Sequence, residues 1–221
     1  MSGEFAPPGP LRGNVAAPPD KSISHRAALL GAFGSGVVRI SRYLDSEDTR
    51  STLRAMERLG AEVRSEASGE GALEVDIEGF GLRGAAEPAG SIDVGNAGTL
   101  IRLLTGLLAG QEGRRFVLDG DDSIRGRPMA RIAAPLNRAG GRVETADGGV
   151  PPLVVDGSAL RGAEHRLEIA SAQVKSALLL AGLLADAPTS VREPAATRDH
   201  TERMLRAAGV TVRAERRTTL P

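Results

Sequence analysis

The chain has 221 residues, enough for one large domain or two small ones, and its shares of hydrophobic (41%) and charged (25%) residues are ordinary. Lysine plus arginine and aspartate plus glutamate both number 28, a balance that argues against a nucleic-acid or membrane-surface partner. Cysteine is absent, which excludes disulfides and thiolate chemistry, and three scattered histidines do not suggest a metal site.

The first predicted unit opens with a polar helix start at Lys21-Ser22-Ile23-Ser24, which runs into the apolar residues 27–30. Because this helix has no polar face, we expect it to be buried. Asp45 or Ser46 is the expected N-cap of the amphipathic helix that comes next. A strand at Val37–Ile40 is expected before this helix, which is predicted at Ser46–Leu59. Two strands are expected after it, at Ala61–Ser65 and Leu73–Ile77.

The second unit repeats this order. A glycine-rich turn, Asn96-Ala97-Gly98-Thr99, enters the apolar residues 100–104. The outer helix is expected to have a proline, Pro128, in its first turn. The elements that follow the buried helix are predicted at Arg115–Leu118, Pro128–Ala139, Arg142–Thr145 and Leu153–Val155.

The third unit starts at Ser171-Ala172-Gln173-Val174, and its apolar run, Ala177–Ala185, is far below the roughly 20 residues that span a bilayer. The N-terminal residues 1–10 lack an apolar signal core, so we expect a cytoplasmic protein. Further elements are predicted at Thr189–Arg192, Asp199–Ala208 and Val210–Arg213. No partner strand follows the last of these, so we expect the chain to be part of a longer protein.

The three polar helix starts are evenly spaced, because 75 residues separate Lys21 from Asn96 and Asn96 from Ser171. Each unit alternates strands and helices as βαβαββ, which indicates an α/β fold. Buried helices with amphipathic strands place the helices inside and the sheets outside. In such a pseudo-threefold arrangement three helix N-termini would point at one place, where their dipoles favour anions.

Each helix start offers polar groups for an anion, although a capped and solvated helix end would also explain each one alone. Lys21, Ser22 and Arg26 combine two cations and a hydroxyl with free backbone N–H groups. In the second unit Gly95 and Gly98 permit a close approach to the backbone, and Asn96 and Thr99 offer hydrogen bonds.

Three further positions are candidates. Arg125 or Arg127 stands before a helix N-terminus, where a cation is unfavourable unless an anion joins it. Lys175 enters an apolar helix, so its ammonium group must reach solvent or find a partner. Asp199 or Thr197 can cap the last helix, and Glu202 would complete a capping box with Asp199, which leaves Arg198 free to face a ligand. His200 could act as a general base, but we favour a structural role for it in the helix.

Taken together, these segments closely resemble EPSP synthases (3-phosphoshikimate 1-carboxyvinyltransferases) of the second bacterial class, in family order from about Leu11 to Val212. Ala172 stands where the first class has a second serine, which affects a side-chain contact at that position. The matching segments are Pro19–Arg26, Gly95–Thr99, Arg127–Met129, Ser171–Ser176 and Thr197–Glu202.

The resemblance implies an inside-out α/β barrel, the EPSP synthase-like fold, in which two domains of three βαβαββ units close at a hinge. Residues 1–13 would belong to the other domain or to the hinge. Residues 14–221 would form one domain, with units at about 14–90, 91–165 and a truncated 166–221, and a second, C-terminal domain would be missing.

The resemblance also implies the ligands. Shikimate 3-phosphate would be bound by Lys21, Ser22, Arg26, Ser171, Ala172, Gln173 and Arg198, and phosphoenolpyruvate by Lys21, Gly98, Arg127 and Gln173. Lys21 would be the catalytic residue here, and the acid–base groups would come from the other domain. The inhibitor glyphosate would occupy the phosphoenolpyruvate place beside Gly98.

We therefore expect a shikimate-pathway transferase for aromatic amino-acid biosynthesis, monomeric at full length, without metal or cofactor. The present chain alone is expected to bind substrate without turnover. A UDP-N-acetylglucosamine enolpyruvyl transferase is the nearest rival, and the Lys-Ser-x-Ser-x-Arg start and the lack of cysteine argue against it. A non-catalytic anion-binding module is a second possibility. A ligand-free repeat scaffold is a third, and it leaves Lys175 and Arg198 unexplained.

Overall fold

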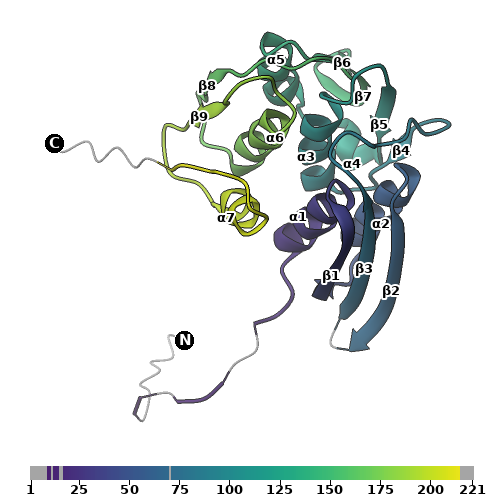
Figure 1. Cartoon of the computed structure of the whole chain (residues 1–221), viewed down its shortest axis with the longest axis vertical. Helices are drawn as coiled ribbons and strands as arrows, with labels where there is room; N and C mark the ends of the chain where they lie inside the picture. Colours follow the sequence, from purple (N-terminus) through teal and green to yellow (C-terminus); the bar gives the residue numbers. More distant parts are fainter. Residues whose placement is uncertain (1–8, 11, 15–16, 70, 215–221) are drawn as a thin grey trace, which may run out of the picture.

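Three apolar helices lie at the centre of the molecule with the sheets outside them (Figure 1). The computed structural model describes residues 9–10, 12–14, 17–69 and 71–214. Helix α3 packs against α6 and contacts α1, so the first helices of the three units are neighbours in space. These helices are α1 (Lys21–Ala32), α3 (Gly98–Leu108) and α6 (Ala172–Gly182).

The sheets follow the repeat. The first has the order β1-β3-β2 and is antiparallel throughout, with β1 (Ser35–Leu44), β2 (Glu62–Gly69) and β3 (Ala72–Phe80). The second has the order β4-β5-β7-β6, with β4 (Ile92–Asp93), β5 (Arg115–Asp119), β6 (Arg142–Ala146) and β7 (Val150–Asp156). The third is the parallel pair β8 (Glu164–Arg166) and β9 (Ser190–Arg192).

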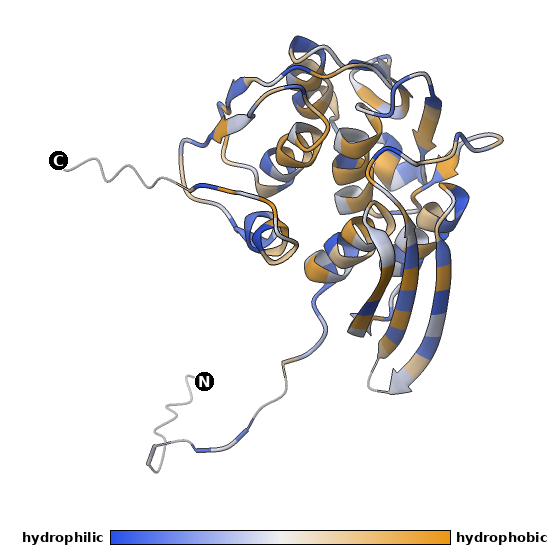
Figure 2. Cartoon of the chain, in the orientation of Figure 1, coloured by the Kyte–Doolittle hydropathy of each residue, from blue (hydrophilic) through white to orange (hydrophobic). Residues whose placement is uncertain are grey.

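Amphipathic helices complete each unit, and their sequence signals decide where they begin. Helix α2 (Glu47–Arg58) starts after Ser46, whose side chain forms a capping box with Thr49. The second unit has a short α4 (Asp122–Arg125) and α5 (Ala130–Arg138), and the third has α7 (His200–Ala207). Colouring by hydropathy shows the apolar residues concentrated where the central helices meet (Figure 2).

Close packing of the central helices depends on a glycine. A Cβ atom at Gly106 of α3 would lie 2.2 Å from the carbonyl oxygen of Ala177 in α6. Leu103, Leu104 and Leu107 are fully buried beside it, so apolar area removed from water drives this contact. The core therefore brings two helices of consecutive units close enough for their starts to share a site.

Several sequence predictions were wrong in detail. The outer helix of the second unit begins at Ala130 rather than Pro128, and a separate helical turn, α4, precedes it. Val210–Arg213 is not a strand, because a strand needs a hydrogen-bonded neighbour and the described residues provide none there. Among the described residues, only the second unit has all four strands of the βαβαββ order, with α4 inserted before α5, and no strand precedes α1.

The capping box predicted for α7 is also wrong. Asp199 stands at the N-cap position but its side chain makes no cap hydrogen bond. The Glu202 carboxylate instead lies 2.8 Å from the ammonium of Lys175. A buried cation attracted the carboxylate more strongly than an exposed backbone N–H group did. None of the described helices is long and apolar enough to cross a membrane.

Candidate functional site

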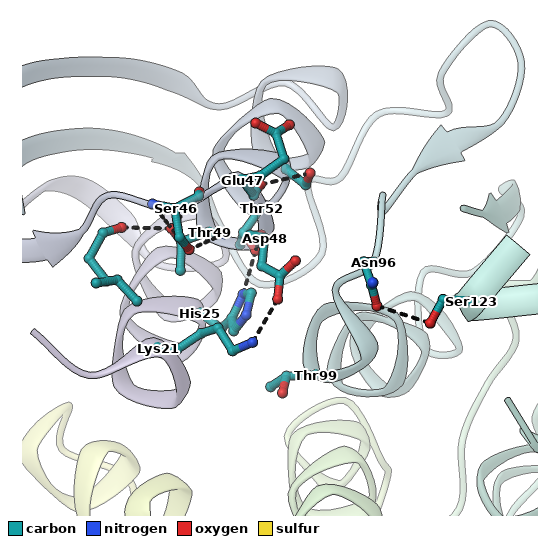
Figure 3. Close-up of polar contacts among 12 residues, drawn as sticks. Lys21, His25, Ser46, Glu47, Asp48, Thr49, Thr52, Asn96, Thr99 and Ser123 are labelled. Carbon is teal, nitrogen blue, oxygen red and sulfur yellow. Dashed lines mark hydrogen bonds and ion pairs between the residues drawn. The ribbon is translucent and has the colours of Figure 1, made fainter. Parts of the chain in front are cut away.

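The start of α1 presents a lysine beside an open cavity. Asp20 caps the helix by accepting a hydrogen bond from the Ile23 N–H at 2.8 Å, which fixes the first turn. The ammonium of Lys21 lies 2.7 Å from a carboxylate oxygen of Asp48, in the first turn of α2 (Figure 3). This lysine side chain remains about half exposed, so it is held near the cavity and is not buried by its ion pair.

A cavity of about 460 Å³ opens between the three helix starts. It is polar and carries groups from all three units, which confirms the predicted convergence of the helix N-termini. Its lining consists of Lys21, Ser22, His25, Asp48, Asn96, Gly98, Thr99, Arg127 and Gln173.

Of the two arginines before the outer helix, Arg127 is the one that reaches this cavity. Arg125 is held away by Asp119, whose carboxylate accepts from its Nε at 3.1 Å and its Nη2 at 2.7 Å. The Nη2 of Arg127 donates to the Asn96 side chain at 2.6 Å, and Arg127 makes no ion pair among the described residues. The charge of Arg127 is therefore available to an anion in the cavity.

Helix α3 begins at Gly98 without a side-chain cap. A Cβ atom there would lie 2.3 Å from Nη1 of Arg127 and 2.9 Å from Nη1 of Arg102. The absent side chain is what allows two guanidinium groups to lie against the helix start. Since a helix N-terminus carries partial positive charge, this part of the cavity strongly favours an anion.

A hydrogen-bonded chain links α3 to α6 and orients Gln173. Arg102 donates to Oε1 of Gln173 at 3.1 Å, and Nε2 of Gln173 donates to the Thr99 hydroxyl at 2.9 Å. Because a guanidinium can only donate, the amide oxygen of Gln173 must face Arg102. The Thr99 hydroxyl thus accepts from Gln173, which leaves its proton for an acceptor in the cavity.

A second cavity, of about 510 Å³, adjoins the first because Gln173 lines both. The start of α6 forms one wall, where Ser171 caps the helix through the Val174 N–H. The segment before α7 forms the other wall. The lining consists of Ser171, Ala172, Gln173, Ala196, Thr197 and Arg198.

Arg26 lies apart from both cavity linings. It is buried, and its guanidinium donates to the Ser22 carbonyl at 2.8 Å, to the Thr201 hydroxyl at 2.7 Å and to the Ser176 hydroxyl at 2.9 Å. These bonds connect α1 to α6 and α7. A direct contact between Arg26 and an anion stays a prediction, whereas its support of the three helix starts is visible in its contacts.

Two site-forming acids were missed by sequence reasoning. Asp48, in the first turn of α2, was not singled out as a site residue, yet it pairs with Lys21. Glu193 carried no signal, and it forms a buried ion pair with Lys175 at 2.8 Å. Lys175 thus has the partner that its apolar helix required. Burial lowers its pKa, but hydrogen bonds to Glu193 and Glu202 outweigh this and raise the pKa above its ordinary value.

His25 is the other buried titratable group at the first cavity. Its Nδ1 lies 2.6 Å from the Thr52 hydroxyl, and its buried Nε2 has no hydrogen-bond partner in the described part of the chain. Burial is the main reason that the pKa of His25 falls to about 4, so the ring is neutral at pH 7. The described residues contain no cluster of three or more His, Asp or Glu side chains that could hold a metal ion.

The fold and the cavities define an α/β domain of repeated units, with polar cavities that carry lysine and arginine side chains where buried helix N-termini converge. The sequence profile described as EPSP synthase (3-phosphoshikimate 1-carboxyvinyltransferase) matches residues 5–220. The chain belongs to this family.

Its relatives agree with this assignment. It is 54% identical over 206 residues to the 3-phosphoshikimate 1-carboxyvinyltransferase of Anaeromyxobacter sp. (strain K), covering 93% of this chain and 45% of the relative. It is also 52% identical over 214 residues to a Thermus thermophilus protein of the same name, and this match covers 96% of this chain and 49% of the relative.

A solved EPSP synthase from Acinetobacter baumannii superimposes with a TM-score of 0.85 at 44% identity, over 92% of this chain and 45% of that one. The neighbour supports the EPSP synthase-like fold, an inside-out α/β barrel, that the resemblance implied. The chain spans about half the length of the curated relatives it matches.

Proposed function

We propose that this chain is the substrate-binding part of an EPSP synthase, which transfers the enolpyruvyl group of phosphoenolpyruvate to the 5-hydroxyl of shikimate 3-phosphate and releases phosphate. The observation that carries the proposal is the pair of adjoining cavities that share Gln173. Each cavity has its own arginine without an ion pair among the described residues, Arg127 in one and Arg198 in the other. Two anions can therefore be held side by side.

The first cavity suits phosphoenolpyruvate. Lys21 lines it from the start of α1 and Arg127 from the loop between α4 and α5, and Gly98 leaves the α3 N-terminus open to a phosphate or carboxylate. Lys21 is the proposed catalytic residue, because its ammonium can leave Asp48 and follow the charge of the reacting anion. Gln173, oriented by Arg102, contacts both ligands.

The second cavity suits the phosphate and ring of shikimate 3-phosphate. Ser171 and Arg198 supply a hydroxyl and a guanidinium, Ala172 supplies backbone, and Gln173 can hydrogen-bond a ring hydroxyl. Ser22 and Lys21 would reach the same ligand from the first cavity. Arg26, which donates to the Ser22 carbonyl, would hold this first turn of α1 in place. The general acid and base of the reaction are proposed to lie on a second domain, with residues 14–221 forming the first.

The wider setting is part of the same proposal. The full-length protein is proposed to work in the cytoplasm as a monomer, with neither cofactor nor nucleic acid. Residues 1–8 and 11 lie outside the described residues, so the assignment of 1–13 to the hinge or the other domain stays a prediction.

Calorimetric titration of the chain with shikimate 3-phosphate at low salt tests the proposal. We expect binding that Arg198→Ala weakens by about 1.5–3 kcal/mol, the value of a hydrogen bond to a charged group. Arg203→Ala is the matched control, because Arg203 is an exposed α7 arginine outside both cavities. UDP-N-acetylglucosamine should give no heat. A folded chain that ignores shikimate 3-phosphate, or prefers the nucleotide sugar, would overturn the proposal.

A further inference from the structure

A buried lysine at the back of the second cavity neutralises two carboxylates. The Nζ of Lys175 in α6 lies 2.8 Å from Oε2 of Glu193 and 2.8 Å from Oε1 of Glu202. All three side chains are close to nine-tenths buried. A buried charge is strongly destabilising without its partner, so each of these three groups depends on the others.

These contacts hold both ends of the segment that forms the cavity wall. Glu193 stands just after β9, Glu202 lies in the first turn of α7, and the residues between them include Ala196, Thr197 and Arg198. The Thr197 hydroxyl also donates to Oε1 of Glu193. The wall is therefore tied to α6 before any ligand arrives.

Arg198, in contrast, is exposed and makes no hydrogen bond or ion pair among the described residues. Burial is the main reason that the pKa of Arg26 is lowered; Glu202 is close enough to act against this, and Arg198 is close enough to lower that pKa further. Oε2 of Glu202 is buried and has no hydrogen-bond partner among the described residues. The Glu202 carboxylate is thus a competing acceptor for the Arg198 guanidinium behind the cavity, and Lys175 neutralises the charge of this carboxylate.

The four buried charges balance. Lys175 and Arg26 offset Glu193 and Glu202, so the interior behind the wall is neutral and exerts no net pull on Arg198. Without Lys175 the interior would carry a net negative charge, and at low dielectric that charge would attract the nearest mobile cation.

We propose that Lys175 is a positioning residue for anion binding: by neutralising Glu193 and Glu202 it keeps the guanidinium of Arg198 in the second cavity. Lys175 lines neither cavity, and it acts only through Arg198. The inference rests on the proposed function in one respect, which is the use of shikimate 3-phosphate as the ligand.

A double-mutant cycle on the 221-residue chain tests it, with shikimate 3-phosphate affinity measured by calorimetry. We expect Lys175→Met and Arg198→Ala each to weaken binding by about 10- to 100-fold, the loss of one charged hydrogen bond. The Lys175→Met/Arg198→Ala chain should bind within about twofold of Arg198→Ala, because both changes remove the same interaction. Arg203→Ala serves again as the control. Additive losses would overturn the proposal, since a purely structural Lys175 would act in both backgrounds.

Lys175→Met leaves two buried carboxylates facing one another and is at risk of misfolding. The Lys175→Met/Glu202→Gln chain removes one of them and restores the balance with Arg26. We expect it to fold and to bind shikimate 3-phosphate within about threefold of wild type. If this chain is folded by circular dichroism yet binds as weakly as Arg198→Ala, the proposal is wrong. Failure of the wild-type chain to bind would instead refute the proposed function.

Discussion

His25 should make the stability of this protein depend on pH in a window set by its own titration. The residue is only 1% exposed, and Nε2 of its ring finds no hydrogen-bond partner within the described ranges. Burial lowers the pKa of His25 to about 4, from 6.5 for an unhindered histidine. Asp48 and Asp20 raise the pKa, while Lys21 and Arg26 lower it, and desolvation is larger than any of them.

The sign follows from proton uptake. Between about pH 4 and 6.5 the unfolded chain protonates this histidine and the folded chain does not, so stability rises with pH across that window. The contribution is complete above pH 6.5 and is lost as the pH falls through about 4. A difference of about 2.5 pKa units corresponds to about 3 kcal/mol, which is a large part of the stability of a typical domain.

Urea unfolding of wild type and His25→Asn from pH 4 to 7.5 measures this contribution. Asparagine keeps a polar atom near the Thr52 hydroxyl but does not titrate. The free energy of unfolding of wild type minus that of His25→Asn should be about 3 kcal/mol lower at pH 4 than at pH 7. Carboxylate titration affects both chains and cancels in the difference. Parallel stability curves would refute the reasoning, because they would mean that the folded ring takes up a proton as easily as the unfolded one.

Three further outcomes follow from the packing and the site. Gly98→Ala should push the Arg127 guanidinium aside and reduce the affinity for glyphosate, which is longer, more than that for phosphoenolpyruvate; titrations with both ligands check this. Gly106→Ala should lower the free energy of unfolding by about 3 kcal/mol, because its Cβ meets backbone that cannot move. The 221-residue chain should release no phosphate from phosphoenolpyruvate and shikimate 3-phosphate, because at the first cavity of this chain Asp48 is paired and His25 is buried. The Thermus thermophilus relative is the positive control.

Much of the local structure could be predicted because its signals are short-range. The helix predicted at Ser46–Leu59 is Glu47–Arg58 in the structure, with the predicted Ser46 cap. The buried helices were recognisable because they lack a polar face, and their 75-residue spacing predicted that their starts would meet. Convergence of groups from all three starts on one cavity confirms that prediction.

The errors arose where distant residues compete with local signals. Asp199 and Glu202 have the spacing of a capping box, but Lys175 lies beside Glu202 only in the folded chain. Arg125 and Arg127 are equivalent in sequence, and the position of Asp119 on β5 decides which of them faces the cavity. For Arg26 the predicted contact with an anion stays a prediction; the structure adds its hydrogen bonds to the Ser176 and Thr201 hydroxyls, which no local signal indicated.

The α/β class, the repeated units and the helix starts that carry the candidate ligands could all be predicted from the sequence, because they follow from periodicity, capping and composition within a few turns of chain. The family resemblance came from the motifs themselves, such as Pro19–Arg26 and Ser171–Ser176. Which charges are paired became clear from the three-dimensional fold. Lys21 pairs with Asp48, and Lys175 pairs with Glu193 and Glu202. Arg127 and Arg198 make no ion pair among the described residues. Electrostatic pairing depends on distance through space and on burial, and neither is written in the spacing of residues along the chain.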